Sequence, residues 1–598
     1  MILTDVLTTG IDALQFWLVA FLLVFTLAGL IFNLLSPEKL FIFVAVVLLL
    51  SGTLTPAQTL AGFSNTGIFT IAALYVVVAG LKEAGATQLI RRYLVGTPKN
   101  QHDASVRVLP VTVVLSAFVN NTPIVAMFTT LLQDQSKRFS IQLSSILIPV
   151  SYASILGGVC TLIGTSTNLV VDGLVKQSGH HGFSLFELAW VGIPIALVGL
   201  AYMYWAAPRL LPKRESSIEQ FDQVREYLVE MLIQPGSELI RKSIQDAGLR
   251  NLPGLYLVEI ERSGQVLSAV RPRTLLEEGD RLVFAGSPQS VLELNTIHGL
   301  TLADEQRFKL DGNSSDRRLF EAVLSPSNPM IGLTIKASRF RHRYSAVVLS
   351  VSRHGERLSG KVGEIILCEG DTLLIEGQKG FLMRYRNSRD FLLVSKLGTP
   401  PAADERKAIP AILIFLAMIL ASATGFISIF ESSILAAMAM LTMRCISYED
   451  AGKSVDYQVL LVIACAFALG AAVDSVGLAR EIAAVLLQVT SSPLGALVAI
   501  YVSTVVLTEL MTNNAAAIIM LPIGMSTAAS LGVHFEPFAI AVMIAASASF
   551  MTPTGYQTNL MVMGPGGYRF MDYVRFGAPL SLLVGIVAIA IIPLVWSF

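Results

Sequence analysis

Long apolar runs, each long enough to cross a bilayer, occupy both ends of this chain and leave a charged segment between them. In hydrocarbon only helices satisfy their own backbone hydrogen bonds, so each run predicts a membrane-spanning helix. The runs lie near residues 16–35, 39–57, 67–83, 145–160 and 188–206, and then near 408–427, 432–443, 458–475, 491–510, 537–550 and 578–597. The sequence therefore predicts an α-helical polytopic membrane protein with a soluble insert.

Composition agrees with this fold class and excludes several others. Charged residues make up 14% of the chain and hydrophobic residues 53%, whereas a soluble domain carries roughly 25% charged residues. The formal net charge is zero, which argues against a nucleic-acid partner, since such proteins need a basic excess. The cysteines are far apart and match no metal-binding or disulfide spacing; they are Cys160, Cys368, Cys445 and Cys465.

Basic residues indicate the orientation in the membrane. The segment before the first run has none, and neither does the loop at 51–67. The opposite side carries Arg91, Arg92, Lys99, Arg107, Lys137, Arg138, Arg209, Lys213 and Arg214. By the positive-inside rule this side is cytoplasmic. We therefore expect a multi-pass protein of the cell (inner or plasma) membrane whose insert lies in the cytoplasm.

The two membrane halves resemble each other. Ala79–Gly85 corresponds to Ala471–Gly477, and an Asn-Asn pair follows 35 residues after the first glycine and 36 after the second, at Asn120 and at Asn513. A further asparagine follows each pair, at Asn168 and at Asn559. We predict two repeats, 1–207 and 407–598. If each has five spans and one re-entrant hairpin, the second copy is inverted, which is typical of transporters.

The insert holds a second duplication with a constant offset of 91 residues. It pairs Pro235 with Pro326, Glu278-Gly279-Asp280 with Glu369-Gly370-Asp371, and Gly286 with Gly377. Alternating runs such as Leu255–Ile260 and Leu282–Phe284 predict small α+β modules, which we place at 208–300 and 301–406. Each module resembles the C-terminal domain of the TrkA or potassium-conductance regulator (RCK) family. That resemblance implies a regulatory ligand pocket or a dimer contact; the alternative is a structural spacer.

Four polar clusters interrupt the apolar halves: Asn120–Pro123, Gly164–Asn168, Thr512–Asn514 and Thr552–Asn559. Gly, Pro and Asn break helices, and a broken helix at membrane depth is tolerated where it lines a protein cavity. The alternative is that these residues only bond neighbouring helices. Because the four clusters recur at matched spacing, we interpret them as one binding site.

None of the four clusters contains Arg or Lys. An anion there would be held by helix N-termini, backbone N–H groups and neutral Asn, Thr and Gln side chains. Carbonyl and hydroxyl oxygens in the same segments suit Na⁺. Two unit charges about 4 Å apart interact by about 4 kcal/mol at an effective dielectric near 20. We therefore expect sodium and the anion to bind together and only weakly apart.

The membrane halves resemble the divalent anion:sodium symporter family of the ion transporter superfamily. The family's hairpin tips carry Ser-Asn-Thr, matched here by Asn120-Asn121-Thr122 and by Asn513-Asn514-Ala515, and its loops of the type Gly-Thr-Pro-Pro-Asn are matched by Gly164–Asn168 and Gly555–Asn559. Three features depart from that pattern: Asn120 replaces Ser, Ala515 replaces Thr, and both loops lack the double proline. The Gly-Tyr-Gln-Thr-Asn loop and the insert resemble sulfate permeases, which favours sulfate over a dicarboxylate.

The resemblance implies roles for individual residues. The anion would face Asn120, Asn121, Thr122, Thr165, Asn513, Asn514, Tyr556 and Gln557. One sodium ion would be framed by Ser116, Asn121, Cys160 and Gly164, and a second by Glu509, Thr512, Asn514 and Gly555. The resemblance also implies a homodimer with elevator-like motion.

Glu509 is unusual because it is a carboxylate at the end of an apolar run. An ionisable residue at that depth predicts function, so Glu509 either ligates sodium or carries a proton. Counted from Asn120, Ser116 would be its counterpart in the first half. Asp172 and Asp474 are weaker candidates that we expect to cap helices or face water.

We predict a sodium-coupled symporter that imports a divalent oxyanion, with no organic cofactor and no enzymatic activity, since no nucleotide loop or nucleophile–base pair is recognisable. The alternatives are a dicarboxylate symporter, a sodium/proton antiporter in which Glu509 and Asp474 titrate, an anion channel gated by the insert, and a membrane sensor.

Overall fold

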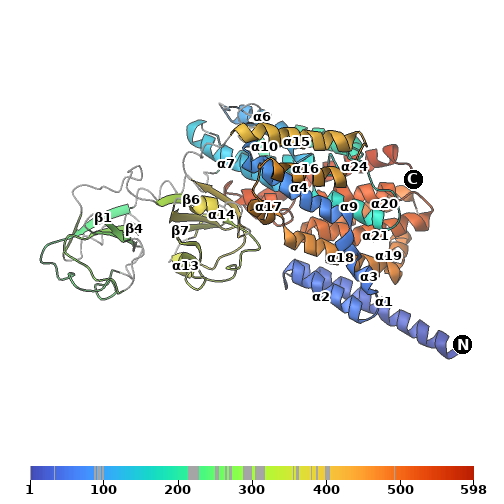
Figure 1. Ribbon diagram of the computed structural model, residues 1–598, viewed down its shortest axis with the longest axis horizontal. Helices are drawn as coiled ribbons and strands as arrows, with labels where there is room; N and C mark the ends of the chain where they lie inside the picture. Colours follow the sequence, from blue (N-terminus) through green and yellow to red (C-terminus); the bar gives the residue numbers. More distant parts are fainter. Residues whose placement is uncertain are drawn as a thin grey trace. The chain divides into compact units, whose positions relative to one another are not determined.

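The computed structural model describes residues 2–32, 34–86, 89, 96, 98, 100–139, 141–212, 214, 228–249, 255–262, 265–267, 273–286, 299–302, 317–353, 356–358, 362–378, 380–385, 388, 390–396, 405–490 and 492–598 (Figure 1). The chain divides into two compact units, Met1–Arg214 with Pro400–Phe598, and Glu215–Thr399. Of the basic residues that indicate orientation, Arg91, Arg92, Lys99 and Lys213 lie outside the described residues.

The first half of the membrane unit is helical. Its main helices are α1 (Ile2–Ile31), α2 (Pro37–Leu50), α3 (Pro56–Leu60), α4 (Thr66–Glu83), α6 (Gln101–Ser116), α7 (Asn121–Phe139), α8 (Leu147–Gly158), α9 (Ser166–Gln177) and α10 (Ala189–Leu210). The short breaks between α6 and α7 and between α8 and α9 coincide with the first two polar clusters. The sequence prediction that these clusters interrupt helices is therefore confirmed for the first half.

The second half repeats this order. Its helices are α15 (Glu405–Ala423), α16 (Ile429–Thr442), α17 (Tyr448–Ser454), α18 (Tyr457–Ser475), α19 (Leu478–Val489), α20 (Pro493–Leu510), α21 (Asn513–Leu531), α22 (Glu536–Ser547), α23 (Gln557–Met563) and α24 (Phe570–Val595). The two halves interlock, since α4 packs against α16, α10 against α24 and α9 against α21.

Within the described residues, seven helices are long and apolar enough to cross a membrane, and four shorter apolar helices accompany them. One of the seven, Asn513–Leu531, matches none of the predicted runs. Its sequence begins with two asparagines and contains one proline and three serine or threonine residues, so it is less apolar than its neighbours. The predicted class, a polytopic helical membrane protein with a sheet-containing insert, is confirmed.

The helix pair α6–α7 corresponds to α20–α21, and this correspondence changes the predicted register. Gly85 and Gly477 both have positive φ, at 86° and 76°. The second helix of each pair starts at an asparagine, Asn121 and Asn513, and each lies 36 residues beyond its glycine. The counterpart of Asn513 is therefore Asn121, one residue further on than the sequence comparison indicated.

The insert contains two antiparallel sheets of the same topology. The first consists of β1 (Leu228–Ile233), β2 (Leu255–Arg262), β3 (Gln265–Leu267), β4 (Arg281–Gly286) and β5 (Leu300–Leu302), in the order β3-β2-β4-β1-β5. The second consists of β6 (Arg317–Leu324), β7 (Ala346–Arg353), β8 (Glu356–Arg357), β9 (Thr372–Gln378) and β10 (Phe391–Lys396), in the order β8-β7-β9-β6-β10. Each strand of the first sheet has its counterpart at the same place in the second.

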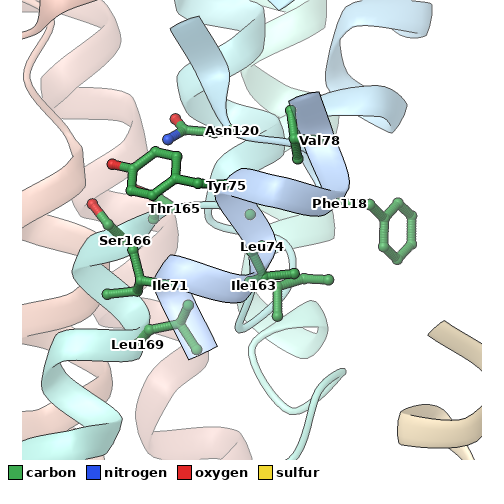
Figure 2. Close-up of a pocket in the computed structure, with 11 residues that line it drawn as sticks. Ile71, Leu74, Tyr75, Val78, Phe118, Asn120, Ile163, Thr165, Ser166 and Leu169 are labelled. Carbon is green, nitrogen blue, oxygen red and sulfur yellow. The ribbon is translucent and has the colours of Figure 1, made fainter. Parts of the chain in front are cut away.

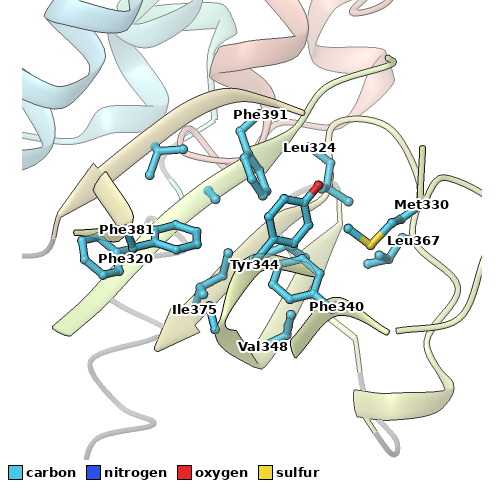
Figure 3. Packing of buried hydrophobic residues seen from close by; sticks show 14 of the residues in the cluster. Phe320, Leu324, Met330, Phe340, Tyr344, Val348, Leu367, Ile375, Phe381 and Phe391 are labelled. Atoms are coloured by element: carbon cyan, nitrogen blue, oxygen red, sulfur yellow. The ribbon is translucent and has the colours of Figure 1, made fainter. Parts of the chain in front are cut away.

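The second sheet is covered by a buried aromatic cluster (Figure 3). Two short helices, α13 (Phe340–Tyr344) and α14 (Phe381–Tyr385), supply rings that pack onto strand residues. The Tyr344 hydroxyl donates to Asp390 at 2.6 Å, and burial raises the pKa of Tyr344 well above its ordinary value. This cluster gives the second module a core of its own.

The Glu-Gly-Asp turns have a structural role in both modules. Gly279 and Gly370 adopt positive φ, which glycine accepts without strain. The aspartate after each is fully buried and accepts two hydrogen bonds from one arginine: Asp280 from Arg262 at 2.7 and 2.8 Å, and Asp371 from Arg353 at 2.7 and 2.8 Å. The motif thus closes the turn before β4 and β9.

Candidate functional site

Each half contains a helix break at which one asparagine side chain donates hydrogen bonds to two backbone carbonyl groups. Asn168 Nδ2 donates to the carbonyl oxygens of Gly158 at 3.2 Å and Thr161 at 2.9 Å. Asn559 Nδ2 donates to those of Ser549 at 3.0 Å and Thr552 at 3.1 Å. In both cases the carbonyls lie ten and seven residues earlier. The two asparagines therefore satisfy backbone groups that the broken helices α8 and α22 leave unpaired.

The hairpin tips repeat a second contact. Ser116 Oγ donates to Asn121 Oδ1 at 2.5 Å, and Thr508 Oγ1 donates to Asn513 Oδ1 at 2.9 Å. Both donors come five residues before their asparagine. Because each amide carbonyl is held by a hydroxyl, its NH₂ group must turn to the other side. The tips therefore present amide donors.

A third repeated contact identifies the counterpart of Glu509. Thr161 Oγ1 donates to the carbonyl oxygen of Ala117, and Thr552 Oγ1 contacts the carbonyl oxygen of Glu509 at 3.3 Å. Ala117 therefore corresponds to Glu509, and the expectation that Ser116 does so is wrong, because the register differs by one residue. The carboxylate is present in one half only.

The two halves meet at their broken segments. Asn121 Nδ2 donates to the Tyr556 hydroxyl at 2.5 Å, and Thr165 Oγ1 lies 3.4 Å from the same oxygen. Thr122 Oγ1 contacts Gln557 Oε1 at 3.4 Å. The structure thus brings five of the predicted substrate residues into one network.

A matching contact runs in the opposite direction. Asn514 Oδ1 accepts from Thr167 Oγ1 at 3.1 Å and lies 3.4 Å from Ser166 Oγ. Ser166 and Thr167 belong to the Gly164–Asn168 cluster, but the family pattern did not single them out. Asn514 and Thr122 occupy equivalent positions after their tips, so each tip reaches the loop of the other half.

Asn120 lines a small cavity beside this network (Figure 2). The cavity measures about 30 Å³, which is more than the roughly 10–15 Å³ that a single water molecule requires. Tyr75 of α4 also lines it, together with Thr165 and Ser166. Tyr75 could not be singled out from the sequence, because it lies inside an apolar run. None of the eleven lining residues is basic.

The residues predicted for a first sodium ion converge in part. A Cβ atom placed on Gly158 would lie 3.1 Å from Asn121 Oδ1 and 3.5 Å from the carbonyl oxygen of Gly164. With Ser116 Oγ on the same amide, these oxygens form a compact set. Cys160 Sγ instead contacts the Leu156 carbonyl of its own helix at 3.3 Å. Gly158, which the sequence did not indicate, belongs to this group by position.

The second predicted set centres on Glu509. This carboxylate is 8% exposed, and it accepts from the Met551 N–H at 2.8 Å and from Thr552 Oγ1 at 2.7 Å. A Cβ atom on Gly555 would lie 3.1 Å from Glu509 Oε2. Glu509 and Gly555 therefore lie together. Thr552, which belongs to the predicted Thr552–Asn559 cluster but not to the predicted sodium set, is their further partner.

Thr512 and Asn514 make different contacts. Thr512 is an exposed N-cap of α21, and Asn514 bonds to the first half, as described above. Among the described residues, no group of three or more His, Cys, Asp or Glu side chains lies together. A cation bound at these tips would thus be held by hydroxyl, amide and backbone oxygens, with one carboxylate in the second half.

The weaker carboxylate candidates differ from each other. Asp172 is 2% exposed; it pairs with Lys176 at 2.7 Å and accepts from the Phe183 N–H at 2.7 Å. The expectation that Asp172 caps a helix or faces water is therefore wrong: it anchors the loop after α9. Asp474 is exposed near the end of α18.

Comparison with known proteins agrees with this architecture. A family model described as a citrate transporter matches residues 22–545. A Chlamydomonas reinhardtii protein named for a response regulator of sulfur deprivation is 35% identical over 561 residues, which cover 92% of this chain and 96% of the relative. Sodium/sulfate cotransporter 1 of the same alga is 26% identical over 747 residues, covering 89% of this chain and 84% of the relative.

This chain is also similar to a solved structure, that of the GsuK RCK domain. The matched region covers 27% of this chain and 63% of the RCK chain, at 13% identity and a TM-score of 0.15. The family match and the relatives confirm the expectation of an anion transporter of the ion transporter superfamily. The chain is a multi-pass membrane protein and belongs to the citrate transporter family.

Proposed function

We propose that this protein is a sodium-coupled symporter that imports a divalent oxyanion, with sulfate as its cargo. The observation that carries the proposal is the orientation of three asparagine side chains. In each of Asn121, Asn513 and Asn514, the side-chain amide oxygen accepts a hydrogen bond from a serine or threonine hydroxyl. Their NH₂ groups are thereby turned away from those hydroxyls. Each NH₂ carries two hydrogens, so Asn121, which gives one to Tyr556, keeps a second donor suited to an oxyanion.

Helix N-termini add to this donor set. Asn121 of the network starts α7, α9 starts at Ser166 directly after Thr165, and Asn513 starts α21. The N-terminus of a helix carries a partial positive charge and unpaired N–H groups. Three helix starts near one network favour an anion without any basic side chain, as in transporters with broken helices.

Sodium is proposed as the coupling ion because this donor set has no full positive charge. Oxygen atoms of Ser116, Asn121 and Gly164 are close together in the first half, and Glu509 contributes a carboxylate in the second. A cation about 4 Å from the anion would add about 4 kcal/mol of attraction at an effective dielectric near 20. The relatives named sodium/sulfate cotransporters support the same pair of ions.

Family resemblance also supports a homodimer, elevator-like motion and regulation through the insert, and the basic residues support a cytoplasmic insert. A cross-linking experiment in native membranes would test the dimer, and protease protection of 215–399 in sealed vesicles would test the side on which the insert lies.

The transport proposal is tested by uptake of radiolabelled sulfate into proteoliposomes, with and without external sodium. We expect saturable uptake that requires sodium, with weaker competition by succinate and phosphate than by thiosulfate. Stronger competition by succinate or citrate would identify a carboxylate symporter. Proton movement on addition of sodium without any anion would identify an antiporter, and sulfate flux independent of the sodium gradient would identify a channel.

A further inference from the structure

We infer that Tyr556 selects a compact oxyanion over a dicarboxylate, an inference that rests on the proposed anion transport. The first step is the asymmetry between the two helix breaks. Gly164 and Gly555 occupy equivalent positions, as do Asn168 and Asn559 with their paired carbonyl contacts. The residue after the glycine is threonine in the first half and Tyr556 in the second.

The second step is what the phenol ring reaches. The Tyr556 hydroxyl accepts from Asn121 Nδ2 at 2.5 Å and lies 3.4 Å from Thr165 Oγ1. The ring thus fills the space between the loop of the second half and the hairpin tip of the first. A threonine at this position is too short to span that space. A cargo with two carboxylates joined by a carbon chain would need this volume, whereas a tetrahedral oxyanion presents all its oxygens around one atom.

The third step is the direction of the hydrogen bonds. Ser116 donates to Asn121 Oδ1, so Asn121 Nδ2 is the group that faces Tyr556. The phenol oxygen therefore accepts from Asn121 and keeps its own proton for another acceptor. Among the described residues, the other hydrogen-bond partner of the Tyr556 hydroxyl is Thr165 Oγ1, at a long distance of 3.4 Å. An oxyanion is a stronger acceptor than a threonine hydroxyl, so the tyrosine proton is available to the cargo.

Two substitutions separate the ring from its hydroxyl. Tyr556→Phe keeps the ring and removes the donor, so we expect the KM for sulfate to rise about tenfold while succinate remains excluded. Tyr556→Thr copies the first half and removes the ring, so we expect both weaker sulfate uptake and new, saturable succinate uptake. Both are measured in proteoliposomes with radiolabelled sulfate and succinate.

Tyr501→Phe is the matched control. Tyr501 lies in α20, is 3% exposed, and its hydroxyl has no hydrogen-bond partner among the described residues. Removing this hydroxyl should leave the sulfate KM unchanged, and succinate should still be excluded. Monodisperse elution on size exclusion shows that each variant is folded, and if Tyr556→Thr does not fold, the sulfate KM of Tyr556→Phe decides.

An unchanged sulfate KM in Tyr556→Phe overturns the inference, as does a folded Tyr556→Thr variant that still excludes succinate. Failure of the proposed function looks different, because wild-type protein would then show no sodium-dependent sulfate uptake at all.

Discussion

The two helix breaks of the membrane unit share their backbone frame but differ in the groups they present. Asn168 and Asn559 each hold two carbonyl oxygens at the same spacing. Inside that shared frame, the first half has Ala117 where the second has Glu509, and Thr165 where the second has Tyr556. Both copies therefore keep the contacts that allow a helix to break inside a membrane. The chemistry of transport can differ at the positions between them.

The largest expected effect comes from removing the frame. Asn559→Ala leaves two buried carbonyls without their donor and also removes the acceptor of Ser151 Oγ at 2.7 Å. Each unpaired buried group costs about 1–3 kcal/mol, so we expect loss of uptake and a large fall in Tm.

Asn168→Ala should cost less, because Asn168 Oδ1 has no hydrogen-bond partner among the described residues. Thermal unfolding of the two variants in the same detergent measures the difference. An equal fall in Tm would show that the acceptor contact of Asn559 contributes nothing, and the two frames would then be energetically alike.

The two modules of the insert are a second pair of duplicated units, and equivalent substitutions can be compared between them. Arg353→Ala leaves Asp371 buried without its partner, and Arg262→Ala does the same to Asp280. Breaking such a pair costs about 3 kcal/mol, at the low end of the usual range, because the two arginines are 28% and 25% exposed. Hydrogen exchange of the full-length protein should show faster opening only in the module that carries the substitution. Faster exchange in both modules would mean that they unfold as one unit.

Glu509 is the charge difference between the two halves at the candidate site. Glu509→Gln keeps an acceptor for the Met551 N–H but removes the negative charge. The second half then has an uncharged residue at this position, as the first half has with Ala117. We expect the sodium concentration for half-maximal uptake to rise about tenfold. A carboxylate about 4 Å from a cation attracts it by about 1 kcal/mol in water and about 4 kcal/mol at an effective dielectric near 20, and about 1.4 kcal/mol is tenfold in affinity.

Asp474→Asn, at an exposed position, is the control for this measurement and should change nothing. Unchanged sodium dependence in Glu509→Gln would remove Glu509 from the coupling site. A change in Asp474→Asn would instead favour the antiporter.

The sequence predicted the membrane class, the helix breaks and the duplication because these depend on local properties: apolar length, helix-breaking residues and spacing. It missed the register by one residue because either asparagine of the pair at 120 and 121 fits the spacing, and only the start of α7 distinguishes them.

Partners across the two halves could not be predicted. The Asn121–Tyr556 contact joins residues 435 positions apart. Thr552 reaches Glu509 through its side-chain hydroxyl across 43 positions, and Gly158 lies in the site because its backbone passes close to Asn121. The family pattern placed Asn514 with Glu509, whereas the fold turns its carbonyl towards Thr167 of the other half. Such pairings depend on how the halves interlock, which no spacing within one half encodes.

The smallest expected effect again compares the insert modules. Burial raises the pKa of Glu369 above its ordinary value, so the folded module binds its proton more tightly than the unfolded chain does. The ionised carboxylate therefore destabilises the module at neutral pH, and this cost disappears as the pH falls through the raised pKa towards the ordinary one. Glu369→Gln should stabilise the second module at neutral pH by less than about 1 kcal/mol, and by nothing once the carboxyl is protonated in both states.

Hydrogen exchange of β9 amides at neutral and acidic pH measures the gain, with Glu278→Gln in the first module as the matched substitution. If β9 gains the same stability at both pH values, the effect comes from altered packing and not from charge. The two Glu-Gly-Asp turns would then differ in their side-chain contacts, although their arginine–aspartate pairs are the same.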